Sequence, residues 1–236
     1  MIVVVANRWD QVAQAFVSRW AAHNIRVLTS QDLSAVGWHQ RLSSADQATA
    51  VVGKEVVPQK EIEAVVTRIP CVVAEELFDI VPGDRPYVAT EMTAFLLFWL
   101  SSLKCLVVNR PTPTCLSGPY WRQENWARAA AAAGIPVEPV CRRSMFPSPG
   151  PQHVTSQTLT NVTVIGPRVF GDTDPVLHDQ ARRLADVAGV ELLVVRFSNP
   201  ERGARFVSAD VYPDLSNDAI ASAMLDCLQQ GTQVHA

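Results

Sequence analysis

The sequence predicts an α/β protein in which a parallel sheet forms first and a mixed α+β part follows. Residues 2–6 are a short apolar run, mostly β-branched, which is typical of a buried parallel strand. A predicted helix and a second predicted strand come directly after it, and this order indicates a parallel sheet with helices packed against it. Residues 204–211 are instead expected to pair antiparallel with the strand before them, across a turn at residues 199–203.

The first half of the chain supplies the parallel sheet. Asp10 is placed to cap a helix that runs to about residue 23, and residues 26–29 then form the second strand. Residues 50–57 indicate a small hairpin that turns at Gly53 and Lys54. The other elements expected in this half are a strand over 61–66, a helix over 87–103 that is apolar on all sides, and a strand over 105–108.

The second half alternates helices and strands. An alanine-rich helix over 121–133 should stop at Gly134, a residue that favours helix ends. The proline-rich stretch 143–157 is expected to be a linker or loop. Beyond it we expect a strand over 161–165, a helix over 175–189, strands over 191–197 and 204–211, and a closing helix over 217–229.

Composition excludes some classes of partner. The chain has 236 residues, a formal net charge of -3 and no long run of basic residues, so we expect no nucleic-acid partner. Its longest apolar stretch, residues 94–103, is about half of the roughly 20 residues that cross a bilayer, so we expect no membrane association. The first residues lack the basic start of a signal peptide, and we expect a cytoplasmic protein.

The five cysteines are scattered and show no CxxC spacing. This pattern indicates small buried residues in a reducing compartment. A zinc site would need clustered cysteine or histidine ligands, and the sequence shows no such cluster.

Four stretches, in chain order, carry a resemblance to a known family. They are Thr67-Arg68-Ile69-Pro70, Asp84-Arg85-Pro86-Tyr87 followed by Glu91, Val107-Val108-Asn109-Arg110-Pro111, and residues 126–137 ending in Gly134-Ile135-Pro136-Val137. Together they resemble the ATP-grasp ligases, especially the branch that modifies ribosomal peptides or joins amino acids. The resemblance implies a Rossmann-like parallel-sheet subdomain over 1–115 and a shortened ATP-grasp-like α+β subdomain over 116–236 that lacks most of the lid.

The chain departs from the family where the family holds phosphates. Lysine is absent after Lys104, and Gln123, with Arg122 beside it, stands where the family has a lysine. Lysine is a common point charge against phosphate. The span between Pro136 and Gly166 contains no lysine and only one glycine, and it is too short for the family's lid.

The family's metal motif is altered as well. The Glu-x-Asn of the family corresponds to Asp210-Val211-Tyr212, and tyrosine is a poor ligand for magnesium. The acidic residue expected on the preceding strand is replaced near Arg196. Phosphoryl transfer depends on positioned cations and metal ions, so these changes argue against ordinary ATP turnover.

Several side chains are candidates for a ligand site. Arg68, Asn109 and Arg110 follow strand ends, where open α/β sheets bind ligands, although a structural turn also explains Asn109 and Arg110. Glu91 is expected to form a structural ion pair with Arg85 or Arg68. The remaining predicted ligand-binding residues are Trp121, whose alternative is ordinary packing with Trp126, and the arginines Arg122 and Arg143.

Three functional hypotheses follow. The first is a degenerate ATP-grasp-like protein that needs no cofactor. It would bind a partner protein, a peptide or a small ligand in a biosynthetic or peptide-modification pathway. Apolar surface left by the missing lid would favour a homo-oligomer or a partner interface. The second is a minimal carboxylate–amine ligase that uses ATP and magnesium, with Asp210 as metal ligand and four arginines in place of lysines: Arg122, Arg142, Arg143 and Arg168. The third is a small-molecule binding module unrelated to nucleotides.

Overall fold

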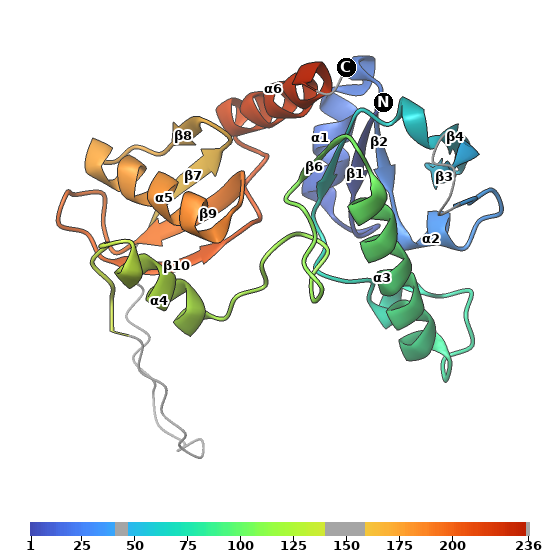
Figure 1. Cartoon of the computed structure of the whole chain (residues 1–236), viewed down its shortest axis with the longest axis horizontal. Coiled ribbons are helices and arrows are strands. Elements are labelled where there is room, and N and C mark those ends of the chain that lie inside the picture. Colours follow the sequence, from blue (N-terminus) through green and yellow to red (C-terminus); the bar gives the residue numbers. More distant parts are fainter. Residues whose placement is uncertain (41–46, 140–158, 235–236) are drawn as a thin grey trace. The chain divides into compact units, whose positions relative to one another are not determined.

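The computed structural model describes residues 1–40, 47–139 and 159–234, which group into two compact units (Figure 1). Unit 1 comprises Met1–Tyr120 together with Tyr212–Ala236, and unit 2 comprises Trp121–Val211. The sequence-based division placed all of 116–236 in the second part. The C-terminal segment belongs to unit 1 because its helix α6 (Asp218–Val234) contacts strands of the parallel sheet.

The core of unit 1 is the predicted parallel sheet, which is confirmed. Its four strands lie in the order β2-β1-β5-β6, and all neighbouring pairs run parallel. The strands are β1 (Ile2–Val5), β2 (Ile25–Leu28), β5 (Ala64–Thr67) and β6 (Leu106–Val108). Because β1 connects outward to β2 and the chain then returns to β5 on the other side, the strand order reverses between β1 and β5.

Both faces of this sheet are covered. On one face Val3, Val5 and Val65 form a buried cluster with Trp99 and Leu100 of helix α3 (Arg85–Ser102). Successive strand residues point to opposite faces. Helices α1 (Gln11–Arg19) and α6 contribute nothing to that cluster but contact β2, β5 and β6, so they cover the other face. Burial on both sides explains why the central strand β1 is apolar throughout.

The first helix begins where the sequence predicts and ends earlier. The Asp10 carboxylate accepts a hydrogen bond from the backbone N–H of Ala13, which confirms the cap. The α-helix stops at Arg19, and a short 3-10 turn (Ala21–His23) leads to Asn24 at a φ of 53°. A short helix, α2 (Ser30–Leu33), was not predicted; the carboxylate of Asp32 caps it through the backbone N–H of Thr29.

The predicted hairpin is confirmed in strands β3 (Thr49–Val52) and β4 (Glu55–Pro58). Gly53 and Lys54 both have positive φ, 58° and 69°. A two-residue hairpin turn of this kind requires positive φ at both central positions.

Helix α3 differs from its prediction. Leu96, Trp99 and Leu100 are buried, but Tyr87, Glu91 and Phe98 are exposed. The helix is therefore buried on one side only, although its sequence is apolar on nearly all sides. The predicted Glu91 ion pair is wrong as well. Arg68 pairs with Asp10, and the Arg85 guanidinium donates to the carbonyls of Ile80 and Phe78.

Unit 2 is built on an antiparallel sheet in the order β10-β9-β7-β8. Helices α4 and α5 contact both this sheet and each other, so they form one layer over it. Gly134 and Gly189 follow these helices at φ of 70° and 64°, in agreement with the predicted helix ends. The elements are α4 (Gln123–Ala132), β7 (Thr160–Ile165), β8 (Arg168–Phe170), α5 (Pro175–Ala188), β9 (Leu192–Phe197) and β10 (Phe206–Asp210).

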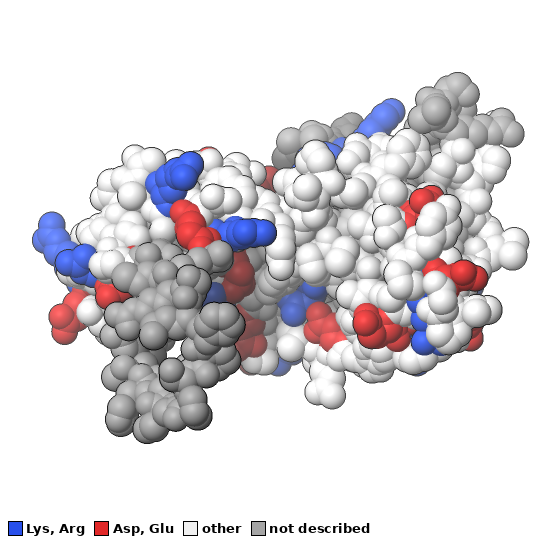
Figure 2. Space-filling model, turned by 90° about the horizontal axis from the view of Figure 1, so that it is seen from below, with Lys and Arg blue, Asp and Glu red and all other residues white. Residues whose placement is uncertain are grey.

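Surface charge on the face drawn in Figure 2 is mixed. Basic and acidic side chains of the described residues alternate there and form no continuous field of one sign. None of the described helices is both long enough and apolar enough to cross a membrane. The whole of the predicted loop 143–157 lies outside the described residues.

Candidate functional site

The carboxyl ends of β1 and β5 define a natural ligand position in unit 1. Open parallel sheets bind ligands outside the strand ends at the point where the strand order reverses, and here that point lies between β1 and β5. The chain carries Asp10 shortly after β1 and Arg68 directly after β5. The sequence predicts Arg68 at this edge but gives no reason to join it to Asp10.

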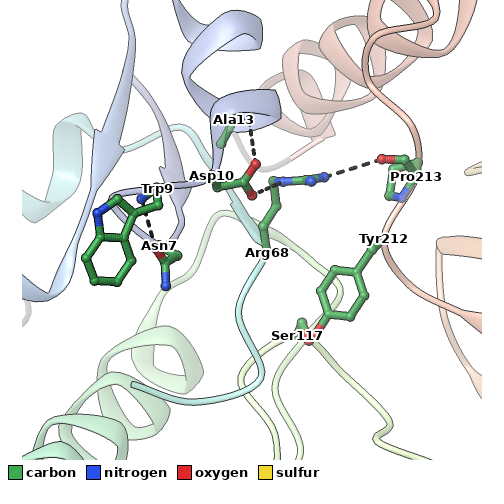
Figure 3. A network of polar contacts seen from close by, with 8 residues as sticks. All are labelled: Asn7, Trp9, Asp10, Ala13, Arg68, Ser117, Tyr212 and Pro213. Atoms are coloured by element: carbon green, nitrogen blue, oxygen red, sulfur yellow. Dashed lines mark hydrogen bonds and ion pairs between the residues drawn. The ribbon is translucent and has the colours of Figure 1, made fainter. Parts of the chain in front are cut away.

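Hydrogen bonds to a carboxylate and to a backbone carbonyl hold the Arg68 side chain in place (Figure 3). Its Nε donates to Oδ2 of Asp10 at 2.8 Å, while Oδ1 of the same carboxylate accepts from the N–H of Ala13 at 2.9 Å. Its Nη1 donates to the carbonyl of Pro213 at 3.4 Å. The Arg68 and Asp10 side chains are only 10% and 17% exposed. The guanidinium therefore connects the first helix to the C-terminal segment.

Asp214 adds a second carboxylate beside Arg68. Hydrogen bonds from the hydroxyl and then the backbone N–H of Ser216 lower the pKa of Asp214, and the charge of Arg68 lowers it further. The carboxylate is thus held in its anionic form. Arg68 is surrounded by acceptors supplied by unit 1.

A second contact anchors the same C-terminal segment. The hydroxyls of Ser117 and Tyr212 lie 2.7 Å apart, and Figure 3 shows the Tyr212 ring directed at Ser117. Ser117 is buried, at 1% exposure. Asn109 directly follows β6 and is also buried, and a side chain at Gly118 would lie 2.9 Å from the Asn109 Cβ. Gly118 has a φ of +101°, so glycine is required there for two reasons.

Replacing Tyr212 with phenylalanine should destabilise unit 1 modestly. The change leaves the buried Ser117 hydroxyl without this partner, which typically costs about 1 kcal/mol. Urea unfolding monitored by fluorescence measures the loss. The matched control is Tyr120→Phe, because the Tyr120 side chain is exposed and should give no measurable change. Equal effects of the two substitutions would show that the hydroxyl contact contributes nothing.

The other predicted ligand-binding residues are dispersed. Arg110 is exposed and donates to the carbonyls of Leu103 and Cys105. Trp121 packs against Trp126, with ring centroids 4.7 Å apart, as the packing alternative predicted. Arg122 is exposed at the start of α4, and its carbonyl accepts from Trp126. Arg143 lies outside the described residues.

Unit 2 places Asp210 on an arginine. Asp210 pairs with Val194 in the ladder, and Arg196 lies two residues further along β9, so both side chains emerge on the same face. Nη1 of Arg196 lies 2.5 Å from Oδ2 of Asp210, and both side chains are about one-third exposed. The scarcity of lysine in the sequence does not predict this ion pair. The feature that could have predicted it is Arg196, which stands near the position where the ATP-grasp family has an acidic residue.

These residues do not match a magnesium site. Magnesium prefers several carboxylate and carbonyl oxygens in octahedral geometry, whereas one Asp210 oxygen faces a guanidinium. The neighbouring Tyr212 directs its hydroxyl to Ser117. Among residues 1–40, 47–139 and 159–234, no three His, Cys, Asp or Glu side chains gather in a way that could hold a metal ion.

No protein-family model matches the sequence, and no curated protein matches it either. Solved structures do match the fold. The macrocyclase MdnC from Microcystis aeruginosa MRC, bound with precursor peptide MdnA, has a TM-score of 0.68 at 11% identity over 98% of this chain and 100% of that chain. The RiPP-associated ATP-grasp ligase of Chryseobacterium gregarium, in complex with ADP and a leader and core peptide, gives 0.67 at 11% identity over 97% and 96%.

A third structure, the ATP-grasp ligase PsnB complexed with minimal precursor, gives a TM-score of 0.68 at 13% identity over 98% of both chains. Identities this low establish the fold alone. The resemblance expected from the sequence motifs is nevertheless confirmed at that level. The chain has an ATP-grasp-like fold of the kind found in peptide-modifying ligases.

Proposed function

We propose that this protein is a degenerate ATP-grasp-like protein that binds a peptide or a partner protein in a peptide-modification pathway, without ordinary ATP-dependent ligation. The observation that carries the proposal is the contact between Arg196 and Asp210. The Arg196 guanidinium supplies the positive charge next to Asp210, the one carboxylate of the family's metal motif that this chain keeps. A metal ion at the same carboxylate would have to displace or tolerate that cation.

The phosphate-binding side of the fold supports the same proposal. Unit 2 contains no lysine in its sequence, and Gln123 donates its side-chain amide to the carbonyl of Val207. Arg122 and Arg168 are both exposed; Arg122 immediately precedes α4, whereas Arg168 lies on β8. The ligase alternative needs such arginines to converge on a triphosphate. It remains the outcome that would overturn the proposal.

The peptide class of partner comes from the structural relatives. MdnC, PsnB and the Chryseobacterium gregarium ligase were all solved with precursor-derived peptides. Their fold extends over nearly the whole of this chain, so the scaffold that accompanies peptide binding in those proteins is retained here. We propose that this protein keeps the ability to bind a peptide or a partner protein but does not catalyse ligation. Cross-linking mass spectrometry on the tagged full chain from its native cells should yield a linked peptide or protein, and light scattering measures self-association.

Thermal unfolding with nucleotide tests the loss of ATP chemistry. We expect no change in Tm with millimolar ATP–Mg²⁺ or ADP–Mg²⁺. A site filled at a hundredfold excess over its Kd would stabilise the protein by about 2.7 kcal/mol, or several degrees.

A matched pair of variants makes the nucleotide result specific. Arg122 and Arg128 are both exposed on or next to α4, but only Arg122 stands beside the position of the family lysine. If ATP–Mg²⁺ stabilises the wild type, and Arg122→Ala removes this effect while Arg128→Ala keeps it, the protein retains a nucleotide site and the proposal is wrong.

A further inference from the structure

Cys71 and Cys115 are neighbours in unit 1 although they are far apart in the sequence. The N–H of Leu116 donates to the carbonyl of Pro70 at 2.9 Å, so the residue after Pro70 and the residue before Leu116 lie on adjoining backbone segments. Cys71 and Cys115 are each the immediate chain neighbour of one end of this hydrogen bond, so the two residues lie close together. A disulfide requires such proximity, with Cα atoms roughly 4.4–6.8 Å apart.

The two thiols differ in access. Cys71 is exposed, whereas Cys115 is buried at 2% exposure, and both are free thiols. Although the Cys71 residue is exposed, partial burial of its thiol raises the pKa of Cys71, and the nearby Cys115 raises it further. Hydrogen bonds in both directions between the backbones of Thr112 and Cys115 hold the buried cysteine in a tight turn.

We infer that Cys71 and Cys115 form a thiol-modification site that reacts with small disulfides, such as oxidised glutathione, and closes into an intramolecular disulfide. The exposed Cys71 thiolate attacks one sulfur of the glutathione disulfide, forms a mixed disulfide and releases one glutathione. Cys115, after losing its proton, attacks the Cys71 sulfur and releases the second glutathione. Two protein thiols are oxidised and one glutathione disulfide is reduced to two thiols.

The bond would fix two segments of the candidate site. Cys71 follows β5 and Arg68, and Cys115 precedes Ser117, whose hydroxyl lies 3.4 Å from the Cys115 sulfur. Oxidation therefore ties the segment that carries the arginine to the segment that carries the buried serine. Closing a loop between residues 71 and 115 should also raise Tm by several degrees, because it restricts the unfolded chain.

Mass spectrometry of the full chain tests this site. Purified protein is treated with oxidised glutathione at pH 8, blocked with N-ethylmaleimide and digested without reduction. We expect a linked Cys71–Cys115 peptide pair that dithiothreitol separates. Because the thiolate attacks and its pKa is raised, the rate should increase with pH, about tenfold per unit below that pKa. No linked pair, or a dominant link from Cys71 to another cysteine, would overturn the inference.

Single variants separate the two steps. In Cys115→Ser, glutathione should remain attached to Cys71, because the second thiol is missing. Cys227→Ser is the control, since Cys227 is partly exposed on α6 and should not affect the Cys71–Cys115 pair. Stable glutathione on Cys71 in the wild-type chain would show that Cys115 cannot reach it, a result that does not depend on any variant folding correctly.

Discussion

Arg68→Ala is expected to lower the free energy of unfolding by about 3 kcal/mol. The substitution removes the partner of the Asp10 carboxylate, which is 17% exposed and would keep its charge in a largely buried place. Breaking a buried pair by removing one member typically costs about 3–5 kcal/mol. The lower end applies because Asp10 still accepts from the N–H of Ala13. Urea unfolding measures the difference.

An exposed ion pair in the same unit provides the control. Arg26 pairs with Glu55, and those side chains are 37% and 64% exposed. Arg26→Ala should therefore cost less than about 1 kcal/mol and should lose its effect at high salt. A double-mutant cycle between Arg68 and Asp10 isolates their coupling. If Arg68→Ala leaves stability unchanged but abolishes binding of a ligand, Arg68 belongs to a ligand site as the sequence predicts.

Trp99→Ala should have the largest effect on stability, about 4 kcal/mol. Trp99 is fully buried in the core cluster of unit 1, and its ring meets that of Trp38 edge-on at 5.5 Å. Truncating a buried tryptophan removes apolar burial and leaves a cavity, which together typically cost about 3–5 kcal/mol. Urea unfolding of the variant at several temperatures measures this loss.

The neighbouring residue of α3 supplies the control. Phe98 is 40% exposed, so Phe98→Ala makes a similar truncation in the same helix without opening a buried cavity and should cost less than about 1 kcal/mol. Trp99→Phe is informative as well, because the Trp99 indole N–H is buried without a hydrogen-bond partner. Losing it removes an unsatisfied donor, so this variant should cost clearly less than Trp99→Ala. Similar losses from Trp99→Ala and Phe98→Ala would contradict the assignment of the core.

The fold was predictable where local chemistry and burial act together. Residues 2–6 are apolar on both faces because helices cover both sides of the sheet. Gly53 marks the hairpin turn because glycine adopts positive φ without strain, whereas Lys54 takes positive φ although its residue type does not favour it. The exposure of α3 was not predictable in the same way. Its apolar residues surround the helix, and only tertiary contacts decide which of them, such as Trp99 rather than Phe98, face the core.

The sequence predicts some of the residues of the candidate site, but it does not predict which of them contact each other. The sequence places Arg68 at a strand end and marks Asp210 and Arg196 as departures from the family. It does not show that Arg68 meets Asp10, because their contact joins residues 58 positions apart through the parallel sheet. The Tyr212 hydroxyl likewise finds Ser117 across 95 positions. Such contacts depend on strand order, which local patterns do not encode.

The contact between Ser117 and Tyr212 has a consequence for how such chains can change length. The backbone leaves the parallel-sheet unit after Tyr120 and re-enters it at Tyr212, and the 2.7 Å hydroxyl contact holds these exit and entry points together. A segment inserted between two adjacent surface points can be lengthened, shortened or exchanged without rethreading its host. Unit 2 is thus a segment inserted into unit 1 between two neighbouring points, and changes in its length or sequence need not disturb the parallel sheet of unit 1.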